Sequence, residues 1–332
     1  MISNQEDHVH FNLGAVSYRD IQDGIVSRVI NAYGMIDHRP WLFDSTYEGH
    51  GYLDIAAVMS DIEINTGLDP RQCCFLIAAD EDLGDLGVRY CSWPWYLVRH
   101  EDFYQNLEHL NLDWSNITIT KCFISLARRP SRSRALMSRL LIDHFSKDQY
   151  MLSFGSQGFV DKDMRTMMQP YEAPQILDDV VDYNQQHRPP PRSFLNCLVN
   201  LVNETIDEYS ITDRNSIFVT EKTFKCFAWR QIPIWNARPG IVASVRRLGF
   251  DVFDDLMDSH CYDHQLDNSL RRGMILDILQ KFCFKYHQNL DSLRRQLWPR
   301  IQHNVDLLVG YISLHNTHRH KLTKYLLNKE QF

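Results

Sequence analysis

The chain has 332 residues, 44% of them hydrophobic and 12% aromatic, which is the composition of a globular protein and excludes extended disorder. A formal net charge of −7 disfavours a surface that coats nucleic acid broadly, although a local basic cleft is compatible with it. A chain of this length is expected to form two domains of ordinary size, each with its own core.

The eight cysteines are scattered without C-x-x-C pairs. This pattern indicates buried thiols in a reducing compartment, and neither a disulfide framework nor a zinc site. Residues 1–14 (MISNQEDHVHFNLG) are polar and acidic, and no run of 18 apolar residues occurs. The sequence therefore predicts no signal peptide and no membrane-spanning helix, and we expect a soluble cytoplasmic protein without a membrane partner.

The N-terminal part has the pattern of a Rossmann-like half. Residues 53–66 have helical spacing and are expected to turn one set of side chains inward, namely Leu53, Ala57, Ile62 and Ile64. The continuous apolar run Cys73–Ala78 predicts a strand that is buried on both faces. Three acidic residues follow at the carboxyl end of that strand, where open parallel sheets place their ligands: Asp80, Glu81 and Asp82.

These three acidic residues have two functional interpretations besides that of solvated loop charge. A D-x-D pair can hold a divalent cation that in turn binds a diphosphate. Alternatively, one carboxylate acts as the general base that takes the proton from an acceptor hydroxyl. The cationic motifs further along the chain favour the base over the metal site.

A basic loop follows Ile117–Ala127, which is expected to form a strand pair or one long strand, and precedes a predicted amphipathic helix, Ala135–Phe145. The planar fork of an arginine donates two parallel hydrogen bonds to phosphate oxygens, so a cluster of arginines at a strand end suits a pyrophosphate. The alternative is a solvated basic loop. The candidate residues are Arg128, Arg129, Arg132 and Arg134, with Arg134 the first choice and Arg129 the second.

A strand–helix–strand–helix unit, the building block of an open parallel sheet, follows the apolar run Phe194–Glu204. Its expected parts are a strand at Ile217–Val219, a helix from Glu221 to about Trp229 with Thr220 as N-cap, a strand at Ile232–Trp235, and a helix from Ile241 to Leu248 that ends at Gly249. The rest of the chain, Leu266 to Leu327, is expected to be helical, with a break or new start at Pro299.

The chemistry of this unit lies at its first strand-to-helix junction. Backbone N–H groups at a helix start favour an anion, and Lys222 and Lys225 add positive charge nearby. Glu221 cannot bind a phosphate, but a carboxylate is a good acceptor for ribose hydroxyls. The combination suits a nucleoside diphosphate, whereas the simpler interpretation is a helix with a charged first turn.

Two short motifs carry a resemblance to a known family. The opening Thr220-Glu221-Lys222-Thr223 and the close with Gly249, Phe250, Phe253 and Asp254 resemble the nucleotide-sugar-binding segment of alpha-1,3-fucosyltransferase-like enzymes. The match is nearer still to related glycosyltransferase-like proteins of bacteria, phages and large viruses, and it covers roughly residues 120–263. The proline usual after the lysine is replaced here, with Lys225-Cys226 in its place.

The resemblance implies an α/β fold with two Rossmann-like domains of the GT-B type and C-terminal helices packing across them. The expected divisions are an acceptor domain at 1–115, a nucleotide-sugar-binding domain at 116–265 and a helical segment at 266–332. The basic loop is similar to the family's N-R-x-x-R-x-x-R segment, with Ala127 in place of the usual asparagine. Asn200 and Glu204 are implied to lie near the sugar or the ribose.

The function implied is transfer of a sugar from a nucleoside-diphosphate sugar to a hydroxyl acceptor, without metal or other cofactor and with inversion at the anomeric carbon. The acceptor is a glycan or, in a phage-encoded enzyme acting in the host cytoplasm, a hydroxymethylated pyrimidine of DNA. The alternative is a catalytically inactive glycosyltransferase-fold protein with a binding or structural role.

Overall fold

The computed structural model describes residues 2–4, 9–12, 25–33, 41–45, 52–66, 69, 73–77, 86, 88–92, 114–127, 131–154, 192–204 and 217–327. The chain forms two compact units: unit 1 comprises residues 1–99, 210–219 and 312–332, and unit 2 comprises residues 100–209 and 220–311. The sequence placed the first boundary after residue 115 and set residues 266–332 apart. In the structure, residues 100–115 and 266–311 belong to unit 2.

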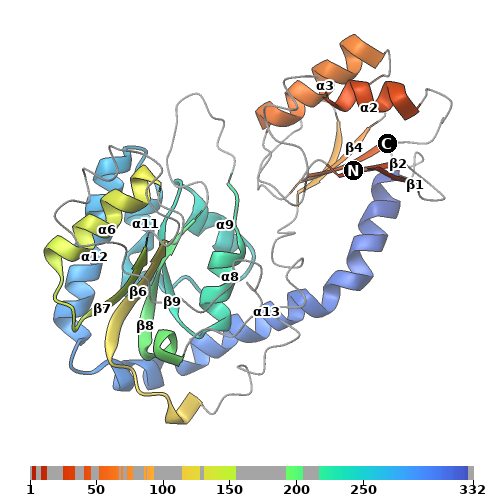
Figure 1. The fold of residues 1–332 in the computed structure, drawn as a ribbon. Helices are drawn as coiled ribbons and strands as arrows, with labels where there is room; N and C mark the ends of the chain where they lie inside the picture. Colours follow the sequence, from red (N-terminus) through yellow and green to blue (C-terminus); the bar gives the residue numbers. More distant parts are fainter. Residues whose placement is uncertain are drawn as a thin grey trace. The chain divides into compact units, whose positions relative to one another are not determined.

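Unit 1 contains a sheet whose strands follow one another in chain order. The strands are β1 (Ile2–Asn4), β2 (Val9–Asn12), β3 (Trp41–Ser45), β4 (Cys74–Ile77) and β5 (Arg89–Ser92); β1 is antiparallel to β2 and the others are parallel. Helix α2 (Ile25–Tyr33) connects β2 to β3, and α3 (Tyr52–Thr66) connects β3 to β4. Because both crossovers advance the same way, right-handed connections place both helices on one face (Figure 1).

The core of unit 1 confirms the predicted strand and the inward positions of Ile62 and Ala57 on the predicted helix, and corrects that of Ile64. Cys74 and Phe75, which point to opposite faces of β4, are both fully buried. On α3 the buried stripe runs through Ile55, Val58 and Ile62, and the backbone N–H of Ser27 on α2 donates to Asp61 Oδ2 at 2.8 Å. Ile64 was expected to face inward but is 74% exposed, since it lies about 200° around the helix from Ile62. The side chain of Leu53 lies outside the described residues.

Unit 2 contains a fully parallel sheet in the order β7-β6-β8-β9. Its strands are β6 (Lys121–Ala127), β7 (Tyr150–Phe154), β8 (Cys197–Asn203) and β9 (Ile232–Asn236). These strands are near-continuous apolar runs, as expected for a parallel sheet that is covered on both faces. The covering helices are α6 (Arg132–His144) and α12 (Asn268–Tyr286) on one face, with α8 (Glu221–Ala228) and α9 (Ile241–Arg247) on the other (Figure 1).

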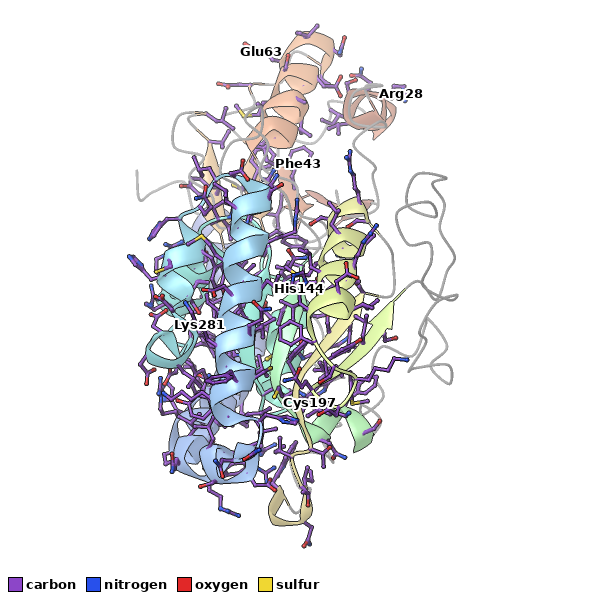
Figure 2. All side chains as sticks on the ribbon, turned by 90° about the vertical axis from the view of Figure 1, so that its left-hand side faces the viewer. Arg28, Phe43, Glu63, His144, Cys197 and Lys281 are labelled. Atoms are coloured by element: carbon purple, nitrogen blue, oxygen red, sulfur yellow. The ribbon has the colours of Figure 1, made fainter. Side chains whose placement is uncertain are left out.

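Helices α6 and α12 lie side by side on their face of the sheet, where Figure 2 labels His144 and Lys281 in front of the strand that carries Cys197. Arg272 Nη1 on α12 donates to Ser133 Oγ on α6 at 3.2 Å. Burial raises the pKa of the Cys197 thiol to about 12. Among the cysteines whose burial is described, all but Cys261 are buried, and all are free thiols.

The strand that precedes α8 is β8, which corrects one prediction. Residues 217–219 belong to neither sheet, although Ile217, Phe218 and Val219 are buried. Ile217 forms only an isolated β-bridge and the run builds no strand of either sheet, so its apolar character mainly reflects burial. Three apolar residues are too few to distinguish the two. The remaining predicted elements of this stretch, α8, β9 and α9, are confirmed within one or two residues.

Short elements complete unit 2, and the predicted helical tail is confirmed. They are η5 (Trp114–Asn116), η6 (Arg192–Asn196), α10 (Asp254–Met257) and α11 (Ser259–Asp263). The long α13 (Leu290–Leu327) belongs to unit 2 up to Tyr311 and to unit 1 from Ile312. Pro299 lies inside α13 and does not end it. The turns on either side are held by the buried side chains of Leu293, Ile301 and Leu308, which offset the backbone hydrogen bond that a proline cannot donate.

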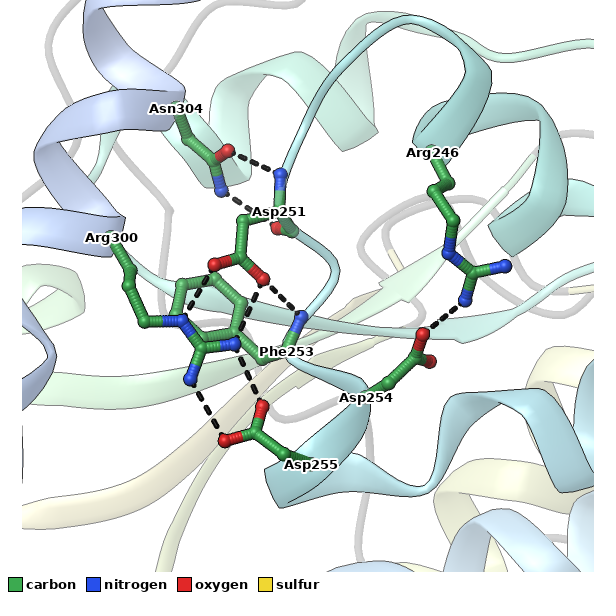
Figure 3. Close-up of polar contacts among 7 residues, drawn as sticks. All are labelled: Arg246, Asp251, Phe253, Asp254, Asp255, Arg300 and Asn304. Atoms are coloured by element: carbon green, nitrogen blue, oxygen red, sulfur yellow. Dashed lines mark hydrogen bonds and ion pairs between the residues drawn. The ribbon is translucent and has the colours of Figure 1, made fainter.

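The close of the resembling segment is a clamp onto α13 (Figure 3). The guanidinium of Arg300 donates to both oxygens of Asp251 at 2.6 and 3.0 Å and to both oxygens of Asp255 at 2.9 and 2.7 Å. It also lies 4.7 Å from the ring centre of Phe253. Asn304 exchanges two hydrogen bonds with the backbone of Asp251, at 2.7 and 2.8 Å. The role of this stretch is therefore to fasten α13 to the loop after α9.

The clamp predicts an acid-dependent loss of stability. The hydrogen bonds from Arg300 hold the pKa of Asp255 below its ordinary value of 3.8, so this contribution is present above pH 3.8 and is lost as the pH falls further. Arg300→Gln is expected to cost about 1 kcal/mol at pH 7, a low figure because the pair is partly exposed. The difference from wild type should shrink at pH 3 in urea unfolding.

The matched control is Lys281→Gln, which removes a cation from an exposed pair with Asp277. It should leave the unfolding free energy unchanged within experimental error at either pH, because the pair is exposed. A cost of Arg300→Gln that stays constant from pH 7 to pH 3 would contradict the assignment.

Candidate functional site

The topology of unit 2 creates a switch point at the carboxyl ends of β6 and β8. From β6 the chain goes to β7 on one side and then returns to β8 on the other, so the strand order reverses between β6 and β8. In open parallel sheets, ligands bind at such a switch point, outside the carboxyl ends of the strands. Helix α6, which carries Arg134, follows β6, and Glu204 follows β8, so the helix start and Glu204 both lie at this place.

A row of buried polar side chains crosses the sheet near the carboxyl ends of β6, β8 and β9. Asn203 Nδ2 donates to Ser125 Oγ at 3.0 Å, and Asn236 Nδ2 donates to Asn203 Oδ1 at 2.9 Å. Polar groups in apolar strands are costly unless they are paired in this way. The sequence interpretation missed all three, although each is a polar residue at or near the carboxyl end of an apolar run.

Glu204 is fully buried immediately after β8, and its carboxylate is engaged by the start of α8. Oε1 accepts from the backbone N–H of Thr220 at 3.2 Å and from Thr223 Oγ1 at 2.6 Å, and Oε2 accepts from Thr220 Oγ1. Trp235 Nε1 on β9 donates in turn to Thr223 Oγ1 at 2.9 Å. The carboxylate therefore joins β8, α8 and β9, whereas the resemblance implied a place against the sugar or ribose.

The first turn of α8 confirms the predicted cap and changes the predicted anion site. Thr220 is the N-cap, because its Oγ1 accepts from the backbone N–H of Lys222 at 3.3 Å. The N–H groups of Thr220 and Lys222 are thus used inside the protein, and Glu204 already supplies a negative charge at the helix start. An external anion at this corner would have to be held chiefly by side-chain cations.

Three charged side chains of α8 lie at this corner. Lys222, whose side chain is 31% exposed, places Nζ 3.2 Å from Thr220 Oγ1 and 3.5 Å from Glu221 Oε1. Lys225 is one turn further along and half-buried. Burial lowers the pKa of Lys225, against an opposing effect of Glu221, so an added anion near its ammonium would offset part of a desolvation cost.

Arg134 connects the α6 corner to the α8 corner. Its buried guanidinium donates from Nη2 to the carbonyl oxygen of Glu204 at 2.6 Å and, at 3.5 Å, to that of Asn203. Ser131 caps α6 by accepting from the backbone N–H of Arg134 at 3.2 Å. Hydrogen bonds thus link Arg134, Glu204, Thr220 and Lys222, with Glu204 at the centre.

Other predicted residues are not part of this assembly or lie outside the described residues. Arg132 is exposed at the start of α6. The side chain of Asn200, in the middle of β8, donates to Gln231 Oε1 at 2.7 Å, and Gln231 precedes β9 at the opposite edge of the sheet. Asn200 therefore has a structural role, because its position three residues before Asn203 keeps it from the carboxyl end. The placements of Arg128, Arg129, Asp80, Glu81 and Asp82 lie outside the described residues.

The start of α9 is closed to an external anion by Asp263. Its carboxylate accepts from the backbone N–H groups of Gly240, Val242 and Ala243, each at 3.0 Å. Burial raises the pKa of Asp263 even though these hydrogen bonds act to lower it. Gly240 has φ 89°, a left-handed conformation that glycine adopts at little cost.

The described residues contain no group of three or more His, Cys, Asp or Glu side chains that could hold a metal ion. No helix in the described part of the chain combines the length and apolar character that crossing a bilayer requires. A scan against models of protein families, a search of curated proteins and a search of solved structures find no match to the chain.

Proposed function

We propose that unit 2 binds a nucleoside-diphosphate sugar at the carboxyl ends of β6 and β8, and that the protein transfers this sugar to a hydroxyl acceptor. The observation that supports the proposal most is that cations of both corners are linked to Glu204 at the switch point of the sheet: Arg134 donates to its backbone carbonyl, and Lys222 donates to Thr220, whose hydroxyl donates to its carboxylate. A parallel sheet, a switch point and cations from two separate corners are the features that a diphosphate site requires.

The chemical argument concerns the leaving group. Transfer of the sugar leaves negative charge on the diphosphate, and cations fixed in a partly buried site stabilise that charge without reorganising. Lys222 and Lys225 provide the cations of the α8 corner, and Arg134 provides the cation of the α6 corner. Glu221, which is mostly buried beside Lys222, is the acceptor for the ribose hydroxyls. In this proposal, fixed side chains replace a metal ion.

The acceptor and the base belong to the finer part of the proposal. The resemblance supports an arrangement with two Rossmann-like domains, in which Asp80, Glu81 or Asp82 takes the proton of the acceptor hydroxyl and the transfer inverts the anomeric carbon. The acceptor is a glycan or a hydroxymethylated pyrimidine. A pyrimidine acceptor would have to leave the base stack, and binding to DNA would weaken steeply with salt.

One observation favours a second candidate, a glycosyltransferase-fold protein that binds but does not turn over. The resemblance implied that Glu204 lies near the sugar, but its carboxylate already accepts hydrogen bonds from three donors at the start of α8. Release of nucleoside diphosphate from its sugar conjugate by the purified protein would separate an enzyme from a binding protein.

The proposal predicts that a nucleoside diphosphate stabilises the native protein. Among GDP, UDP, ADP, CDP and dTDP and their sugar conjugates, at least one is expected to raise the melting temperature, because saturation at 100 times Kd adds about 2.7 kcal/mol. Lys222→Ala should abolish most of that shift. The absence of any shift with all of these compounds would contradict the proposed function.

A further inference from the structure

The hydrogen bonds at the start of α8 form a chain whose two arms converge on the Glu204 carboxylate, one starting at Trp235 and the other at Lys222. Trp235 Nε1 donates to Thr223 Oγ1, whose own proton goes to Glu204 Oε1. On the other side, Thr220 Oγ1 donates its proton to Glu204 Oε2, so both lone pairs of that hydroxyl are left to accept. They accept from the backbone N–H of Lys222 and from its Nζ, at 3.3 and 3.2 Å.

The direction of this chain is determined by chemistry. An ionised carboxylate only accepts, and an ammonium only donates, so the Thr220 hydroxyl between them has one available orientation. The carboxylate of Glu204 is fully buried and cannot reach solvent, whereas the Lys222 side chain is 31% exposed. A negative charge inside the protein thus orients a positive charge at its surface through one hydroxyl.

We propose that Glu204 and Thr220 are positioning residues that hold the Lys222 ammonium at the switch point, outside the carboxyl ends of β6 and β8. We call the hydrogen bonds from Lys222 to Thr220 and from Thr220 to Glu204 the relay, and it depends only on these contacts. Its purpose, which is to present Lys222 to a diphosphate, rests on the proposed function. A lysine carries several freely rotating bonds, and ordering it before a ligand arrives removes an entropic cost from binding. Neither residue needs to touch the ligand to act in this way.

The relay is tested first without any ligand. The order of the Lys222 Cε methylene is measured by ¹³C relaxation in ¹³C-lysine-labelled full-length protein, with Lys222→Ala providing the assignment. Thr220→Val, which removes the hydroxyl but keeps the shape, should make this methylene mobile on the nanosecond timescale, and Thr220→Ser should restore its order. Equal order in the wild type and in Thr220→Val overturns the relay.

The second test uses inorganic pyrophosphate, the part that all nucleoside diphosphates share, and measures its Kd by calorimetry. Thr220→Val should weaken binding about fivefold, and Thr220→Ser should stay near the wild type. The matched control is Thr66→Val in unit 1, which removes a buried hydroxyl that donates to the carbonyl of Ile62 and should not change the Kd.

A double-mutant cycle separates positioning from a general structural effect. If Thr220 acts through Lys222, then Lys222→Ala and the double variant with Thr220→Val should bind pyrophosphate equally, within about twofold. Additive losses overturn the relay. Because Thr220→Val also removes the N-cap, Glu204→Gln is a second variant that keeps the cap hydroxyl; it too should loosen Lys222. A wild type that binds no pyrophosphate and no nucleotide refutes the proposed function, while the relaxation measurement still decides the relay.

Discussion

Replacing Lys222 by alanine is expected to lower turnover of the nucleoside-diphosphate sugar by about 30- to 1,000-fold, equivalent to about 2–4 kcal/mol of transition-state stabilisation. The reason is that Lys222 Nζ is the more accessible ammonium of α8, and it is oriented beside Thr220 and Glu221 at the start of that helix. The measurement is the rate of nucleoside diphosphate release from the donor that the thermal screen identifies.

Lys222 is a cleaner test than Arg134. Arg134 is buried and donates to the carbonyl of Glu204, so its replacement would disturb folding as well as the site. The control for Lys222→Ala is Lys281→Ala, since Lys281 lies in the same unit and is exposed beside Asp277. Turnover by Lys222→Ala that equals turnover by Lys281→Ala would remove Lys222 from the proposed site.

The largest effect on stability is expected from Phe250→Ala, at about 3–5 kcal/mol. Phe250 is 2% exposed, and its ring stacks on Phe227 with centroids 4.5 Å apart and an interplanar angle of 2°. It also contacts Phe224 and Tyr311, at centroid distances of 5.9 and 6.0 Å. Truncation would leave a cavity behind α8, and the loss is a large fraction of the 5–15 kcal/mol that typically holds a domain folded.

The chain offers a matched control of the same residue type. Phe284 on α12 is 95% exposed, so Phe284→Ala should change the unfolding free energy by no more than about 0.5 kcal/mol. Both variants are compared by urea unfolding of the full-length protein. Similar losses for the two variants would contradict the core position of Phe250.

The described elements show what local sequence signals can predict. Thr220 before Glu221 predicted a capped helix start, and the structure has that cap. The apolar run Ile232–Trp235 predicted a strand, which is β9. Both signals act over a few residues, through side-chain-to-backbone hydrogen bonds and strand burial, so neighbouring residues suffice to read them.

The same local reading is wrong where packing decides. The buried apolar residues at 217–219 suggested a strand but contain only an isolated β-bridge at Ile217 and form no strand of either sheet. Asn200 suggested a site residue because it stands in a motif, yet its side chain pairs with Gln231. In each case the residue type was compatible with two environments, and only the position of another segment selects one of them.

The sequence by itself predicted the strand and helix around residues 121–145, the elements α8, β9 and α9, and the two clusters of cations at the helix starts. Periodicity, caps and turn residues encode these features locally. Only the tertiary structure decided the strand order β7-β6-β8-β9, which brings the two clusters to one edge of the sheet, and the role of Glu204 as an internal acceptor. Strand order and buried pairing depend on contacts between residues far apart in the chain, such as Arg134 and Glu204, and no short stretch of sequence contains both partners.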